Sequence, residues 1–299
     1  MKQFSIIIIL LTMVLSGCSK NNTEPVESSK NTEINTNVGQ NKDQDDTKPD
    51  DSGTQQNPIE GEKGDKSNTK DQFKLSNYFK NQFNSSSSVD NNKDQFEWKN
   101  QDVSLTAKKT KAKQAGPEAH NLSSIKIKKA DKSYDLKLSQ NPSQIDSISL
   151  SPNQNYLAVS FDSGSTVVLI NLNNGESVNL NSELELSGKK RIQYIHPYSW
   201  SPNSETIALA YENPSSNIAL YSTANKQFSF TITDTKYIST AFLLWNKNGD
   251  SLDIISEQPS DVYKLYRLDI QNQTVKEIVP ISRNELSSLK DYGPTIIEK

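Results

Sequence analysis

The chain has 299 residues, of which 32% are hydrophobic, and a formal net charge of −3 at pH 7. Its length allows one or two domains, and so low an apolar fraction predicts that part of the chain has no core of its own. A charge this close to zero does not favour nucleic acid as a partner. The single cysteine excludes a disulfide within the chain and a thiolate metal site.

Residues 1–17 are predicted to be a signal peptide. Lys2 precedes an apolar run from Phe4 to Leu15, which has signal-peptide length and is too short to cross a bilayer as a stable helix. The run ends in Leu15-Ser16-Gly17-Cys18, which resembles the lipobox of bacterial lipoproteins. The resemblance implies cleavage between Gly17 and Cys18, a diacylglycerol on Cys18, and a lipid-anchored protein on the extracytoplasmic face of the cell membrane. The alternatives are an uncleaved anchor helix and a simple secretory signal with a chance cysteine.

Residues 18–71 are predicted to form a lipidated, disordered tether. From Ser19 to Asp71 the segment contains no Phe, Tyr or Trp and consists mainly of Asn, Lys, Asp, Glu, Ser, Thr and Gln. Such a composition buries too little apolar surface to offset the entropy of ordering. Its acidic stretch, Asp43 to Asp46, lacks the spacing of a calcium-binding loop. A flexible chain of this length reaches on the order of 40 Å, enough to hold a domain clear of a membrane.

Residues 72–92 are predicted to be a short amphipathic and linker segment. Its apolar side chains are spaced roughly as one helical face, which predicts a short helix that docks on the following domain. A helix at the membrane surface is the alternative. Ser85 to Ser88 are expected to form a flexible break. The apolar residues are Phe73, Leu75, Tyr78, Phe79 and Phe83.

Residues 93–281 contain an internal repeat that predicts the fold class. Anchors at Leu150, Trp200 and Trp245 stand 50 and 45 residues apart, and each precedes a turn and an alternating strand. Two further short strands follow each of these. A degenerate fourth copy starts at Trp98, with outer strands near 124–128 and 134–138. Four short strands per repeat of about 45 residues predict an all-β, propeller-like domain of about four blades, in either a complete or an incomplete ring.

The best copies of the turn read Ser151-Pro152-Asn153 and Trp200-Ser201-Pro202-Asn203. They resemble the W-S-P-D-G-K repeat of TolB-type propellers and related WD-like repeats. The chain departs from that pattern by using Asn where the family has Asp-Gly, a change that we expect the turn to accept because Asn tolerates left-handed backbone angles. The resemblance implies binding or scaffolding more often than catalysis. A closed ring, an open array capped by other elements, and pairing between chains are all compatible with the repeat count.

Residues 282–299 are expected to form a C-terminal helix and a closing strand. Ser282 to Glu285 has the form of a capping box, which predicts a short helix that ends before Gly293-Pro294. The apolar residues from Thr295 to Ile297 could then cover a sheet edge.

The stretch 189–200 is the candidate binding site of the sequence. Its aromatic and basic side chains suit a sugar, a peptide or an anionic polymer. If the strand stays regular through Pro197, one face carries Tyr194, His196, Tyr198 and Trp200. Ordinary packing inside a blade is the alternative. Lysines at 108–113 and 126–129 are interpreted as solvated charge, with contact to an anionic polymer or lipid headgroup as the other possibility. The candidate residues are Arg191, Tyr194, His196, Tyr198 and Trp200.

No enzyme is predicted, since the sequence has no G-x-S-x-G elbow and offers no defined catalytic pair. No cofactor is predicted, and the distant histidines His120 and His196 do not predict a metal site. The leading hypothesis is a scaffold module for a protein partner in the cell envelope, held to the membrane by its lipid. A surface receptor that uses the 189–200 loop is the alternative, and a hydrolase is a remote one.

Overall fold

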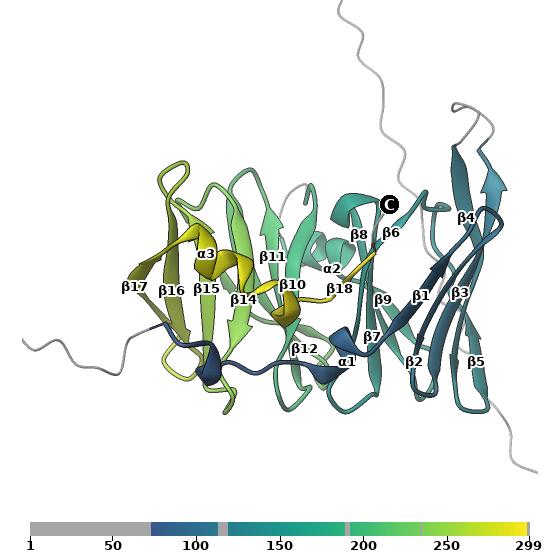
Figure 1. The fold of residues 1–299 in the computed structure, drawn as a ribbon, viewed down its shortest axis with the longest axis horizontal. Coiled ribbons are helices and arrows are strands. Elements are labelled where there is room, and N and C mark those ends of the chain that lie inside the picture. Colours follow the sequence, from purple (N-terminus) through teal and green to yellow (C-terminus); the bar gives the residue numbers. More distant parts are fainter. Residues whose placement is uncertain (1–72, 113–118, 189–191, 234, 298–299) are drawn as a thin grey trace, which may run out of the picture. The chain divides into compact units, whose positions relative to one another are not determined.

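The computed structural model describes residues 73–112, 119–188, 192–233 and 235–297, and it consists of antiparallel sheets of consecutive strands (Figure 1). The predicted signal peptide and tether lie outside the described residues. The all-β, propeller-like class that the repeat predicted is confirmed, because four sheets of four or five strands follow one another along the described chain.

Each sheet contains one copy of the repeat, and two sheets carry an added strand. The first sheet comprises β1 (Ser88–Asn91), β2 (Gln95–Asn100), β3 (Val103–Lys111), β4 (His120–Lys129) and β5 (Lys132–Asp135). The second comprises β6 (Ile145–Leu150), β7 (Tyr156–Phe161), β8 (Thr166–Asn171), β9 (Ser177–Asn179) and, beside β6, β18 (Thr295–Ile296). The third comprises β10 (Ile195–Trp200), β11 (Thr206–Glu212), β12 (Ser216–Ser222) and β13 (Gln227–Ile232). The fourth comprises β14 (Thr240–Trp245), β15 (Ser251–Glu257), β16 (Tyr263–Asp269) and β17 (Thr274–Ile281).

The repeated turn is closed by its own side chains. Ser151 Oγ donates to Asn153 Oδ1 at 2.8 Å and accepts from the amide of Tyr156 at 3.0 Å. In the next copy, Ser201 Oγ donates to Asn203 Oδ1 at 2.7 Å, and the amide of Thr206 donates to it at 3.0 Å. The Ser-Pro-Asn motif therefore recurs because Ser and Asn replace backbone partners in a turn that joins two strands.

The expected reason for tolerating Asn in this turn is wrong. Asn153 and Asn203 serve as acceptors, whereas the left-handed backbone belongs to the next residue in each copy. That residue is Gln154 with φ of 57°, Ser204 with φ of 65°, and Gly249 with φ of 77°. Only the third copy therefore has the residue that such a backbone favours.

We expect Gln154→Gly to raise the free energy of unfolding by about 0.5–1 kcal/mol, because it removes the left-handed strain of a side-chain-bearing residue. Ser204→Gly is the matched control. It relieves the same left-handed strain, but it also removes the hydroxyl that accepts from the amide of Asn153 at 2.9 Å, a loss of about 1 kcal/mol. The two effects should offset each other, so the free energy of unfolding should stay close to that of the wild type. Urea denaturation of both variants checks the pair. Equal shifts in one direction would contradict the assignment of strain.

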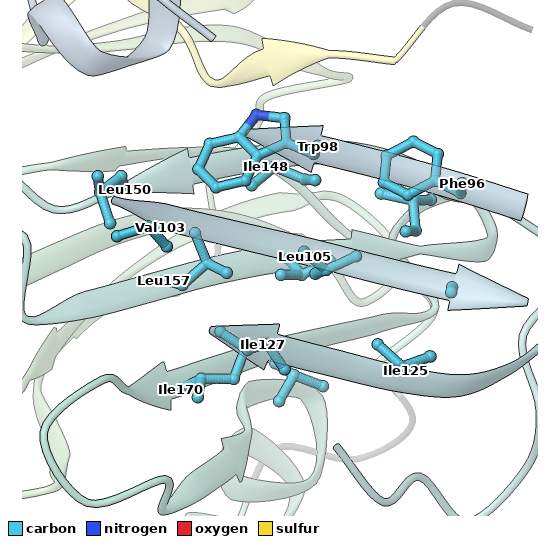
Figure 2. Packing of buried hydrophobic residues seen from close by; sticks show 14 of the residues in the cluster. Phe96, Trp98, Val103, Leu105, Ile125, Ile127, Ile148, Leu150, Leu157 and Ile170 are labelled. Carbon is cyan, nitrogen blue, oxygen red and sulfur yellow. The ribbon is translucent and has the colours of Figure 1, made fainter. Parts of the chain in front are cut away.

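The sheets pack in chain order, each against the next. Figure 2 shows the first core, in which Trp98 and Leu105 from the first sheet lie against Leu150 and Leu157 from the second. Separate cores join the second sheet to the third and the third to the fourth. No apolar cluster of the described residues joins the first sheet to the fourth, so the described array is unclosed.

The hydrogen bonds of the anchor tryptophans also connect the sheets in chain order. Trp200 Nε1 donates to the carbonyl of Ser149 on β6 at 3.3 Å, and Trp245 Nε1 donates to the carbonyl of Ser199 on β10 at 3.1 Å. Each indole thus reaches back to the preceding sheet. Trp98 occupies the same place in the first sheet, and its buried Nε1 has no hydrogen-bond partner among the described residues.

The two ends of the array are finished differently. The outer face of the first sheet is polar and carries exposed ion pairs, Lys99 with Glu97 at 2.8 Å and Lys126 with Asp135 at 3.5 Å. The outer face of the fourth sheet is apolar and is covered by segments from both ends of the described chain. The described array is therefore not a closed ring but an open one, capped at its fourth sheet by the need to bury an apolar sheet face. Pairing between chains stays an alternative.

A strap of residues 73–87 provides the first cover, and it is not the single helix that its spacing predicted. It contains a 3-10 helix at Leu75–Asn77 and one turn of α1 at Gln82–Ser85. Phe73, Leu75 and Tyr78 pack on the fourth sheet, but Phe79 joins the third core and Phe83 the first. The strap therefore crosses several sheets, which a helix of this length could not do.

The expected flexible break at Ser85 to Ser88 is instead hydrogen-bonded. Asn100 donates to Ser86 Oγ at 3.2 Å, and Ser87 Oγ lies 3.2 Å from Thr295 Oγ1. Ser88 then begins β1. These contacts carry the strap directly into the first sheet.

A charge cluster around the buried Asp253 locks the strap to the fourth sheet. The Tyr78 hydroxyl donates to Asp253 Oδ2 at 2.6 Å. Arg267 binds the same carboxylate with two nitrogens, Nε to Oδ1 at 2.7 Å and one Nη to Oδ2 at 2.8 Å. Burial and the adjacent Asp253 carboxylate raise the pKa of Tyr78 far above its usual range, so the hydroxyl stays a donor.

The C-terminal segment supplies the second cover. α3 (Arg283–Ser287) begins at the capping box of Ser282 and Glu285 and is followed by a 3-10 helix at Lys290–Tyr292. β18 then pairs with β6, so the expected strand does cover a sheet edge. The tail also holds the strap, since Asn84 Nδ2 donates to the carbonyl of Gly293 at 2.7 Å and the Tyr292 hydroxyl donates to that of Leu75 at 3.2 Å.

One helix was not predicted. α2 (Leu180–Leu186) follows the short strand β9, and its N-cap is Asn179, whose side chain accepts from the amide of Ser182 at 3.2 Å. Leu180 and Leu184 are fully buried in the core between the second and third sheets. An Asn followed by apolar residues four apart was the available sequence signal.

Candidate functional site

Two strands of the first sheet are longer than the strands of the second, and this creates an overhang. β3 and β4 have nine and ten residues, whereas β6, β7 and β8 have six each. Their far ends, residues 108–111 and 120–123, pair with each other and extend beyond the second sheet (Figure 1). The face of this overhang that looks toward the second sheet therefore has no strand opposite it.

The sequence of β3 changes character where the overhang begins. Val103, Leu105 and Ala107 face the second sheet and are buried in the first core. Beyond a register shift between Thr106 and Lys108, the same face continues with Lys109 and Lys111. On β3, apolar residues occur where a sheet packs opposite and lysines occur beyond it. Leu122 of β4, which pairs with Lys109, is still buried in the first core.

A recess of about 790 Å³ lies under the overhang, between the first and second sheets. It is lined by residues from the β1–β2 hairpin, from β3 and β4, from the start of β6, and by Ile297 after β18. The apolar lining consists of Phe96, Leu122, Ile145 and Ile297. Lys93, Lys109 and Lys111 supply cations, and side-chain amides come from Asn91, Asn92 and Gln144.

The charges in the recess are not balanced by ion pairs. In the described part of the chain, no carboxylate forms a salt bridge with Lys93, Lys109 or Lys111. Asp94 and Asp146 also line the recess. Asp146 already accepts from Gln144 Nε2 at 2.6 Å and from the amide of Gly164 at 3.2 Å. These donors are neutral, so the Asp146 carboxylate keeps its charge. The recess therefore contains three lysines against two carboxylates, a formal excess of positive charge.

The stretch that the sequence singled out lies partly in the core. Tyr198 and Trp200 are buried between the second and third sheets, and Tyr198 OH lies 3.0 Å from Ser147 Oγ. The strand is irregular, because its pairing with β11 shifts between Ile195 and Tyr198. The condition for a common face fails: Ile195 joins Tyr198 and Trp200 in the core, and His196 points away to solvent.

Two candidates of that stretch remain outside the core. His196 is exposed; partial desolvation lowers its pKa, and the negative charge of Asp146 opposes the shift. A hydrogen bond to Glu212, with partial burial, raises the pKa of Tyr194 to about 12. Arg191 lies outside the described residues, as do Gly17 and Cys18 of the lipid-attachment motif.

The sequence did not predict the recess, although the lysine cluster that it showed includes Lys109 and Lys111. Side chains two residues apart in a strand share a face, so Lys109 and Lys111 are expected on one face and Lys108 on the other. This alternation was the signal that could have distinguished the recess lysines from the outer one. No cluster of three or more metal-binding side chains occurs among the described residues. None of the helices within that same part of the chain has the length and hydropathy to cross a membrane.

Comparison with known proteins does not assign the chain to a family. No family model matches the sequence, and no curated protein does. Similar solved structures include TolB from Acinetobacter baumannii, with 11% identity and a TM-score of 0.37 over 60% of this chain and 41% of that one. Two provisionally assigned 6-phosphogluconolactonases are similar at the same level. The Bacteroides uniformis protein has 11% identity and a TM-score of 0.35, and the match covers 63% of this chain and 53% of that one. The Bacteroides fragilis protein has 10% identity and a TM-score of 0.37, and the match covers 63% of this chain and 52% of that one.

This chain therefore spans about half or less of the length of those structures. The similarities are too low to carry a function.

Proposed function

We propose that this protein is an exported lipoprotein, tethered by a lipid on Cys18, whose four-sheet domain is a binding module in the cell envelope. The observation that carries the proposal is the recess under the β3–β4 overhang. It has the volume of a small-molecule site, which is typically about 300–1,000 Å³. Its lining combines apolar side chains with a larger number of polar and charged ones. Catalysis is not part of the proposal.

The recess favours a receptor over a scaffold, because a hollow between two sheets suits a small ligand better than a flat protein surface. This differs from the receptor hypothesis drawn from the sequence, which used the 189–200 loop. Of that loop, Tyr198 and Trp200 serve the core instead.

The anchor is tested by Cys18→Ala, with Ser19→Ala as the matched control at the neighbouring residue. Wild-type protein and Ser19→Ala should sediment with membranes and incorporate labelled fatty acid, and Cys18→Ala should do neither, because acyl chains supply the membrane affinity. Membrane association of Cys18→Ala equal to that of the wild type would overturn the anchor.

The receptor role is tested by cross-linking cells and recovering the tagged protein in mild detergent. We expect no protein partner in near-equal amount. Such a partner, recovered with the wild type and lost with Cys18→Ala, would instead establish a scaffold.

A further inference from the structure

We propose that the recess binds a small ligand in which an anionic group, a phosphate or a carboxylate, is attached to an apolar body. The inference rests on one part of the proposed function, namely that this recess binds a ligand and does not catalyse a reaction. It names the chemistry that the recess would recognise, and it applies equally to a free metabolite and to a lipid headgroup with part of its chain.

The apolar half of the ligand is inferred from the lining. Phe96 and Leu122 come from the first sheet, Ile145 begins β6, and Ile297 follows β18. All four belong to the first core, so the recess lies against one end of that core. An apolar group placed there would remove further apolar surface from water.

The anionic half is inferred from the lysines. Lys109 and Lys111 stand two residues apart on one face of β3, and Lys93 lies in the β1–β2 hairpin. A ligand anion in the recess would form charge-assisted hydrogen bonds with these ammonium groups.

The opposite face of the same sheet offers an internal comparison. Lys108 of β3 and Lys128 of β4 are exposed on the outer face of the first sheet and do not line the recess. Replacing either pair with glutamine changes the net charge equally. Any difference between the two double variants therefore reports the recess and not the general electrostatics of the domain.

The test uses residues 19–299, a form that contains all four apolar cores, because every core residue lies between 73 and 297. Calorimetric titration compares hexyl phosphate with inorganic phosphate, which lacks the apolar chain, and with hexan-1-ol, which lacks the anion. The variants are Lys109→Gln with Lys111→Gln, and Lys108→Gln with Lys128→Gln. Circular dichroism melting confirms that both double variants fold.

We expect hexyl phosphate to bind at least about tenfold more tightly than either half-ligand, since both contacts contribute. The recess double variant should lose about tenfold or more in affinity, and the outer-face variant should keep wild-type affinity. Equal losses in the two variants, or no binding of hexyl phosphate by the wild type, would overturn the inference. Preferential binding of hexan-1-ol would also overturn it while leaving a receptor role intact.

Co-sedimentation with vesicles separates the two sources of such an anion. Binding to phosphatidylglycerol but not phosphatidylcholine vesicles, lost with Lys109→Gln and Lys111→Gln, would identify a lipid headgroup as the ligand source. Hexyl phosphate binding without vesicle binding would identify a free small molecule. Either result supports the recess as an anion site.

Discussion

Replacing Asp253 with alanine is expected to lower the free energy of unfolding by about 3–5 kcal/mol, the largest stability effect of any single change discussed for this chain. The Asp253 residue is 1% exposed, and its carboxylate accepts from both Tyr78 and Arg267. Its removal takes the carboxylate away from a buried hydroxyl and from the guanidinium of the half-buried Arg267. Because Tyr78 belongs to the strap, the same change should loosen the strap from the fourth sheet.

Chemical denaturation measures the loss, and amide hydrogen exchange of residues 75–83 reports the strap. Asp135→Ala is the control, since its ion pair with Lys126 is exposed, with 66% and 51% of the two side chains accessible. Exposed pairs contribute about 0–1 kcal/mol. A cost below about 1 kcal/mol for Asp253→Ala, or unchanged exchange in the strap, would contradict the locking role.

The second large effect concerns the anchor tryptophans. Trp200→Phe and Trp245→Phe should each cost about 2–3 kcal/mol, because each leaves a cavity and removes a hydrogen bond to the preceding sheet. Trp98→Phe makes the same change in volume but has no such bond to lose, so its cost should be about 1 kcal/mol smaller. Thermal or urea denaturation of the three variants compares them directly. Equal costs would mean that the inter-sheet bonds contribute nothing to stability.

The sequence predicted the fold class because its signal is local. Ser151, Asn153 and their counterparts Ser201 and Asn203 close the same turn in the same way, so their spacing measures the repeat directly. The capping box at Ser282 is equally local, and α3 begins there. Patterns whose physical cause lies within a few residues could be interpreted without the structure.

The strap could not be predicted, because its residues pack on different partners. Tyr78 and Phe79 are neighbours in sequence, yet one covers the fourth sheet and the other joins the core between the third and fourth sheets. Helical spacing of apolar residues predicts one common face only when one surface receives them all. Tyr78 binds Asp253, which also binds Arg267, and both of these residues lie far from Tyr78 along the chain. Nothing in the local pattern indicates them.

The candidate site shows the same limit. Alternation from Tyr194 to Trp200 assumed a regular strand, whereas the register shift before Tyr198 turns both aromatic residues inward. The recess depends on a difference in strand length between two sheets and on Ile297, which the tail brings back beside β6. The lysines of β3 were visible in the sequence, but what faces them is decided by the packing of the second sheet.

The most direct test of a receptor site in the recess is native mass spectrometry of the full-length protein isolated from its own membranes. We predict that the wild type carries a small anionic molecule, and that the Lys108→Gln, Lys128→Gln variant carries it too. The Lys109→Gln, Lys111→Gln variant should be free of it. Equal occupancy in the two double variants, or no bound molecule in the wild type, would contradict the assignment of the recess as the binding site.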